Sequence, residues 1–196
     1  AISFLNAMDP APERRISPND RTHRVVVNGI YELPFGRGRR FASRLGGPAG
    51  KLLEGWQLEG IFQRQSGEPL GLGNFIYYGD ARNIVLPASR RTIQRWFNTE
   101  GFERDSRRQL ASNVRTQPSV FSGLRSDPIN YLDLSAIKKT KLTERFSLDF
   151  RAESINALNH PVFEAPDTSP TSSTFGVVTA IKALSRTIQF ALVVRF

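Results

Sequence analysis

The chain has 196 residues, no cysteine, an apolar fraction of 39% and a formal net charge of +9, from 27 Lys and Arg against 18 Asp and Glu. Without cysteine, disulfides and thiolate metal sites are excluded, while the positive balance favours a polyanionic partner such as nucleic acid, phospholipid or lipopolysaccharide. No stretch approaches 18 uncharged apolar residues, so no transmembrane helix is expected, whereas half-apolar transmembrane β-strands stay possible.

The chain begins AISFLNAMDP, which lacks the basic region and the cleavage site of a signal peptide. We therefore expect either a cytosolic protein or a piece of a longer chain. Downstream, five segments alternate between apolar and polar residues with the period of two that is typical of strands with unlike faces. They are RVVVNGIYEL, EGWQLEGIFQRQ, NYLDLSAI, RFSLDFRAESIN and SRTIQFALVVRF, and they predict strands near 24–33, 54–66, 130–138, 145–156 and 186–196.

The connections between these strands differ in length. KKTKLT is predicted to be a tight turn, and PFGRGRRFASRLGGPAGKLL joins the first two strands. Much longer loops, 67–129 and 157–185, fall at the other ends of the strands, and FGVVTAI in the second of them is a candidate short strand. Short connections on one side and long loops on the other are the plan of an outer-membrane barrel.

The aromatic residues fit this interpretation, because several stand at one end of the strands on their apolar side. The predicted periplasmic aromatic girdle consists of Tyr31, Trp56, Phe146 and Phe196. The predicted convex, lipid-facing side carries Trp56, Leu58, Phe62, Phe146, Leu148, Phe150, Phe190 and Leu192. The expected fold class is therefore all-β, with an antiparallel curved sheet belonging to a transmembrane β-barrel, and a soluble β-sandwich is the alternative.

The order and spacing of several blocks resemble a known family. The blocks are DRTHRVVVNGIYELPFGRGRRF, GWQLEGIFQRQSGEPL, RWFNTEGF, NYLDLSAIKKTKLTERFSLDFRAESINALNHPVF and RTIQFALVVRF. Together they resemble the C-terminal part of a TonB-dependent outer-membrane receptor of the Oar-like group, over nearly the whole chain from about Pro18. The chain departs from the more usual Asn-Leu-Phe-Asn at Asn156-Ala157-Leu158-Asn159.

The resemblance implies a 22-stranded barrel with a plug in its lumen, to which this chain contributes the last five strands. Residues 23–196 would be the C-terminal part of the barrel, and residues 1–22 an extracellular loop or the end of a preceding strand. The plug, the TonB box, any N-terminal regulatory-like domain and the signal peptide would lie upstream. The implied location is the cell outer membrane, and the implied function is uptake of an unidentified ligand.

The implied partners are outer-membrane lipid and lipopolysaccharide, the TonB system acting through the plug, the barrel-assembly machinery and the ligand, with no nucleic acid expected. The resemblance assigns an assembly signal to the alternating terminal residues Ile188, Phe190, Leu192, Val194 and Phe196. The lumen-facing candidates are Gln57, Glu59, Gln63, Asp149, Arg151 and Glu153. We expect the last three to pair with neighbours such as Arg195, or to touch the plug or the substrate.

No catalytic or cofactor pattern emerges, so we expect no enzyme and no cofactor. His23 and His160 are the only histidines and have no plausible metal-ligand spacing. GGPAGKL lacks the Gly and Ser or Thr positions of a phosphate-binding loop, and GRGRR is either an RNA-binding element or, as we favour, a solvated periplasmic turn. Two rival functions stay open: a basic nucleic-acid-binding soluble β-domain and a passive porin-type barrel.

Overall fold

A computed structural model of the chain describes residues 4–6, 8–110, 115, 117–183 and 185–196. The chain divides into two compact units. The sheet unit comprises Arg24–Gln65, Ile129–Pro161 and Leu184–Phe196, and the loop unit comprises Ala1–His23, Ser66–Pro128 and Val162–Ala183.

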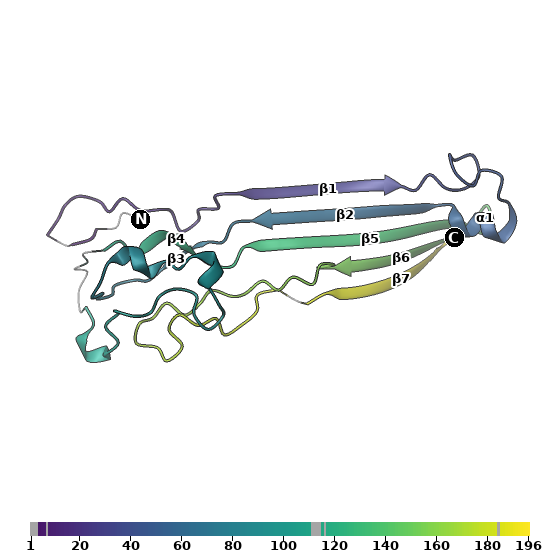
Figure 1. Cartoon of the computed structure of the whole chain (residues 1–196). Helices are drawn as coiled ribbons and strands as arrows, with labels where there is room; N and C mark the ends of the chain where they lie inside the picture. Colours follow the sequence, from purple (N-terminus) through teal and green to yellow (C-terminus); the bar gives the residue numbers. More distant parts are fainter. Residues whose placement is uncertain (1–3, 7, 111–114, 116, 184) are drawn as a thin grey trace. The chain divides into compact units, whose positions relative to one another are not determined.

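The sheet unit is built on five antiparallel strands, which lie side by side in the order β1-β2-β5-β6-β7 (Figure 1). The strands are β1 (Arg24–Glu32), β2 (Trp56–Gln65), β5 (Ile129–Lys141), β6 (Ser147–Ile155) and β7 (Thr187–Arg195). They correspond to the five predicted segments, so the all-β antiparallel fold class is confirmed. Each is about as long as the ~9–11 residues that a tilted strand needs to cross a bilayer. The sheet is open, because β1 pairs with β2, β7 pairs with β6, and neither has another partner among the described residues.

The two connections at the end of the sheet where β7 ends are of unequal size. KKTKLT is not the tight turn, because β5 continues to Lys141, and Lys139 and Lys141 pair with residues of β6. The turn itself is Leu142–Phe146, where the Leu142 amide donates to the Phe146 carbonyl at 3.0 Å. The connection from β1 to β2 contains the short helix α1 (Gly47–Leu53), which was not predicted from the sequence. No helix among the described residues is long and apolar enough to cross a membrane.

The loop unit has a core of its own. It contains a small antiparallel sheet of β3 (Pro69–Gly71) and β4 (Val120–Arg125), and three 3₁₀ turns, η1 (Ala81–Ile84), η2 (Ala88–Arg90) and η3 (Ser106–Arg108). The buried side chains of the core are Leu70, Leu72, Phe75, Ile84, Trp96, Phe97, Phe102, Leu124, Phe175 and Val178. The predicted strand at FGVVTAI does not form: two isolated bridges hold its ends, and Phe175 and Val178 enter the core instead.

Candidate functional site

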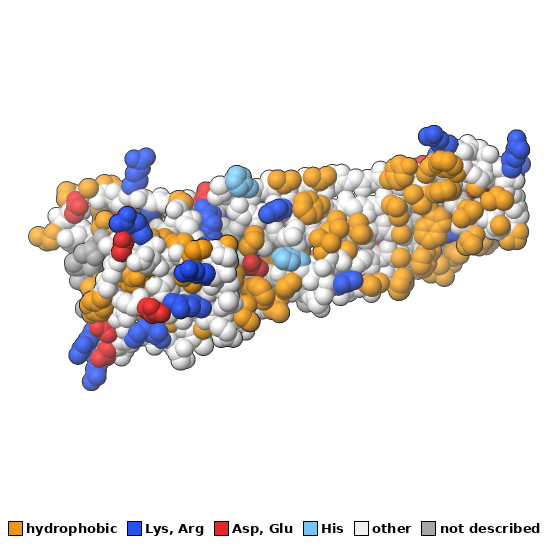
Figure 2. Space-filling view, in the orientation of Figure 1, with side chains coloured by type: hydrophobic (Ala, Val, Ile, Leu, Met, Phe, Trp, Pro, Cys, Tyr) orange, Lys and Arg blue, Asp and Glu red, His pale blue; other side chains and the backbone are white. Residues whose placement is uncertain are grey.

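The strand register gives the sheet unit two unlike faces, because residues directly opposite in an antiparallel pair point to the same side. The apolar face carries Val25, Val27, Tyr31, Trp56, Leu58, Phe62, Leu132, Leu134, Ala136, Leu148, Phe150, Ala152, Ile188, Phe190, Leu192 and Val194. The polar face carries Gln57, Glu59, Gln63, Asp133, Ser135, Asp149, Arg151, Glu153, Gln189 and Arg195, with a few aliphatic residues between them. Figure 2 shows apolar side chains gathered over the strands of this unit.

All six lumen-facing candidates lie together on the polar face. Arg195 forms the expected ion pair with Asp149, at 3.1 Å, and the Asp149 side chain is only 5% exposed. Glu153 accepts a hydrogen bond from the Gln189 amide, and Glu59 accepts one from the Gln57 amide at 2.7 Å. These contacts join neighbouring residues within a strand and across strands, so much of the hydrogen-bonding capacity of the face is satisfied within the sheet.

A groove of about 620 Å³ crosses the polar face near the middle of β2 and β5. Three carboxylates line it, those of Glu59, Asp133 and Glu153, beside Ile30 and Ile61. On β6, two residues before Glu153, the Arg151 Nε atom is buried without a hydrogen-bond partner among the described residues. The groove can therefore offer carboxylate acceptors to a polar or cationic group that approaches the polar face. Within the described residues, no three His, Cys, Asp or Glu side chains are grouped so that they could hold a metal ion.

The four aromatic residues predicted to form a girdle stand at one end of the sheet. Tyr31 is near the end of β1 and Trp56 begins β2, both on the apolar face. Phe146 immediately precedes β6 and Phe196 immediately follows β7, so alternation assigns both to the same face. The geometry thus groups these rings at one level of the sheet, and their role at a membrane interface stays a prediction.

The five residues of the predicted assembly signal share the apolar face of β7 or directly follow that strand. Each is exposed, from 54% for Val194 to 96% for Phe196. Phe190 stacks on Phe150 of the neighbouring strand, with ring centroids 6.2 Å apart. The geometry therefore leaves this face of the strand available to surrounding lipid or to another protein.

Sequence reasoning missed a cluster at the girdle end of the sheet. Lys138 lies opposite Trp56 on the apolar face, and its ammonium group is 5.4 Å from the centroid of the Trp56 ring. The Lys138 ammonium donates to the carbonyls of Lys51 and Glu54, each at 2.7 Å, and the Trp56 indole donates to the Leu52 carbonyl at 2.9 Å. A lysine at an apolar-face position was the signal in the sequence that a local acceptor was needed.

In the loop unit, Trp96, Phe97 and Phe102 are core residues rather than exposed ligand contacts. A buried ion pair, Arg115 with Glu13 at 2.9 Å, joins the N-terminal segment of this unit to the segment between β2 and β5. A second pair, Arg125 with Asp20 at 2.6 Å, does the same and holds the pKa of Asp20 below its usual value. Hydrogen bonds from the Ser172 side chain, the Ser169 backbone amide and the Thr174 side chain lower the pKa of Asp167.

A model of the family described as "outer membrane beta barrel domain" matches residues 2–189, which is nearly the whole chain. Comparisons with curated proteins and with solved structures find no significant match.

Proposed function

We propose that this chain, which belongs to the outer membrane beta barrel domain family, is the C-terminal segment of a TonB-dependent transporter. Family membership makes it part of a barrel in the outer membrane, and the two-faced sheet agrees with an apolar side toward lipid and a polar side toward the lumen. The finer assignment, to a receptor that takes up a ligand, rests on the family resemblance of the sequence blocks and on the loop unit.

The loop unit is the observation that carries the proposal. Its three segments precede β1, join β2 to β5 and join β6 to β7, so all three leave the sheet at the same end of the strands. Among the described residues, the second and third segments share a core of ten buried apolar side chains instead of remaining separate loops. The first segment is tied to the second by the ion pairs of Glu13 with Arg115 and of Asp20 with Arg125. A preordered surface of this kind suits ligand recognition, because little conformational entropy is lost when the ligand binds.

In this proposal, ligand binds first to the loop unit and then passes along the polar face. The carboxylates of Glu59, Asp133 and Glu153 are available there to a cationic or hydrogen-bonding part of the ligand, or to the plug. Energy would come from the TonB system pulling on a plug encoded upstream. Two alternative functions have less support. Membership of an outer-membrane family argues against a soluble nucleic-acid-binding domain. A passive pore would give the ordered loop unit no role.

The proposal is tested on the full-length protein without knowledge of the ligand. We expect it to bind the purified periplasmic domain of TonB in detergent, and to show no steady open-pore conductance in planar bilayers, because a plug closes the lumen. Steady ohmic conductance together with no binding to TonB would identify a passive porin-type barrel and overturn the transporter assignment.

A further inference from the structure

The connection between β1 and β2, residues 33–55, is basic and exposed. It carries Arg37, Arg39, Arg40, Arg44 and Lys51, and no acidic residue lies between positions 34 and 53. Arg39 is neutralised by Glu32 at 3.0 Å. Among the described residues, none of the other four takes part in an ion pair within 4.0 Å, so the connection presents four cationic groups outside ion pairs against one carboxylate of its own, that of Glu54.

The same connection exposes apolar side chains that a soluble turn would not need. They are Phe35 (38% exposed), Phe41 (48%), Leu45 (46%), Leu52 (65%) and Leu53 (40%). The ring centroids of Phe35 and Phe41 are 5.6 Å apart, and the Arg40 guanidinium carbon lies 5.5 Å from the centroid of the Phe41 ring. Apolar and cationic groups are therefore interleaved, as in segments that lie at a membrane surface.

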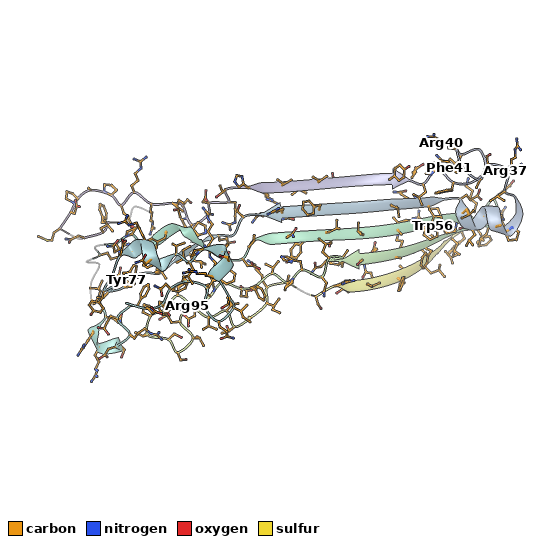
Figure 3. All side chains as sticks on the ribbon, in the orientation of Figure 1. Arg37, Arg40, Phe41, Trp56, Tyr77 and Arg95 are labelled. Carbon is orange, nitrogen blue, oxygen red and sulfur yellow. The ribbon has the colours of Figure 1, made fainter. Side chains whose placement is uncertain are left out.

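The connection is fixed to the apolar side of the sheet. The Lys138 and Trp56 side chains donate to carbonyls in the last turn of α1 and to the carbonyl of Glu54, which directly follows it. Both of these side chains belong to the apolar face. Close packing of the backbone supports this arrangement: Gly55 has φ +76°, and a Cβ there would meet the Lys139 carbonyl oxygen. Figure 3 shows Arg37, Arg40 and Phe41 on the connection and Trp56 on β2, at the same end of the sheet.

We propose that residues 33–55 bind the headgroups of anionic phospholipids in the leaflet at the girdle end of the barrel. Positive charge complements the phosphates, and the exposed Phe and Leu side chains can enter the boundary between headgroups and acyl chains. The connection adjoins the apolar face of the sheet, because Trp56 and Lys138 belong to that face and donate to carbonyls of residues 51–54. A single-stranded RNA would use the arginines but would leave the five apolar side chains in water, so the membrane is the better fit.

The test uses the full-length protein refolded into phosphatidylcholine vesicles that contain spin-labelled phosphatidylglycerol or spin-labelled phosphatidylcholine. The preference of the protein for the anionic label is measured by electron spin resonance. The triple variant Arg37→Gln, Arg44→Gln and Lys51→Gln should lose that preference by roughly 3- to 10-fold, since each basic residue near an anionic surface contributes to attraction. Arg40 is kept because it stacks on Phe41.

The matched control is the triple variant Arg14→Gln, Arg90→Gln and Lys182→Gln, which removes the same charges from exposed positions of the loop unit. This control should retain the wild-type lipid preference. An unchanged preference in the first variant, an equal loss in the control, or displacement of the lipid by single-stranded RNA would overturn the proposal. The assay needs neither TonB nor ligand, so its failure is distinct from a failure of the transport assignment, although it assumes the membrane-embedded barrel.

A depth measurement provides a second readout that does not depend on charge. Leu52→Cys with a nitroxide label should be accessible to dissolved oxygen and shielded from a water-soluble nickel complex, as expected for a side chain at the acyl boundary. Tyr78→Cys, at a position 68% exposed in the loop unit, is the control and should be accessible to the nickel complex. Equal access of the nickel complex to both labels would contradict the proposal.

Discussion

At the scale of single residues, the face and the depth of a side chain in the sheet decide what a substitution costs. Leu134 is 46% exposed on the apolar face, opposite Gly60 on β2 and Ser154 on β6, in the middle of the sheet. Leu148 has the same face but is the second residue of β6, near the girdle end. Charged residues on the lipid side of a barrel are costly at the bilayer centre and much less costly near its surfaces.

We therefore expect Leu134→Arg to destabilise the full-length barrel by about 2–4 kcal/mol, and Leu148→Arg by only about 0–1 kcal/mol. The measurement is the free energy of unfolding by denaturant titration in phospholipid vesicles. Leu148→Arg is the depth control, because it places the same charge on the same face. Equal costs at the two positions, or no cost at Leu134, would contradict lipid contact over the middle of this face.

At the scale of elements, alternation predicted the strands and their faces, because a period of two is a local property of the sequence. The Asp149–Arg195 pair was predictable for the same reason, since two polar-face residues near the ends of adjacent strands come into reach. The loop unit was not predictable from local patterns. Its core depends on contacts between distant segments, such as the Phe97 and Phe175 rings at 5.2 Å and the Trp96 amide donating to the Gly176 carbonyl at 2.9 Å.

In the turn after β6, the residues at 156 and 159 have a clear structural role. Asn156 and Asn159 have φ values of +50° and +51°, a conformation that asparagine tolerates better than most residues. The Asn156 side-chain oxygen accepts from the His160 amide at 3.1 Å, and the Asn159 side-chain oxygen accepts from the Arg186 amide at 3.0 Å. The two asparagines shape this turn, and Ala157 and Leu158 between them are the residues that depart from the Asn-Leu-Phe-Asn block that the sequence resembles.

The segment around Asp167 gives a prediction about pH. Hydrogen bonds from Ser172, Ser169 and Thr174 lower the pKa of Asp167 below 3.8. A carboxylate with a lowered folded-state pKa stabilises the fold above its unfolded pKa, and this contribution is lost as the pH falls through the folded value. We expect amide protection in residues 167–176 to weaken below pH 3.8, as measured by hydrogen exchange corrected for intrinsic rates.

The variant Asp167→Asn should remove this pH dependence. At neutral pH its protection in residues 167–176 should already be reduced by roughly 3- to 10-fold, because hydrogen bonds to a charged acceptor are replaced by weaker ones. The Leu72 amide, which donates to the Ser119 carbonyl at 2.9 Å, is the internal control and should respond less. If wild type and variant lose protection in parallel on acidification, Asp167 is not the titrating group.

At the scale of the whole molecule, the open sheet requires further strands. Within the described part of the chain, the outer edges of β1 and β7 are unpaired, and unpaired edges that also adjoin an apolar face invite aggregation. Five strands cannot enclose a lumen. Neighbouring strands in a complete barrel would remove both edges and turn the polar face inward. The polar contacts of Asp149, Glu153 and Glu59 are then contacts of a lumen wall.

Phe196 bears on how a barrel of this kind is assembled. Phe196 is 96% exposed at the girdle end of β7, so its ring contributes little to packing within the sheet unit. Replacing it with alanine in the full-length protein removes one interfacial contact, worth about 1–3 kcal/mol by buried apolar area. That loss is modest for a large barrel, whereas a chain that the assembly machinery fails to recognise stays unfolded and is degraded.

We therefore expect Phe196→Ala to reduce the yield of heat-modifiable, protease-resistant barrel in outer membranes more than it reduces the stability of barrel refolded in detergent. Leu134→Ala is the matched control, because it shortens an exposed apolar side chain on the same face but outside β7. For this control, the two assays should change together. A normal membrane yield of Phe196→Ala, or equal losses in both assays, would show that the ring contributes only through its contact with the membrane. The predicted role of β7 in assembly would then be wrong.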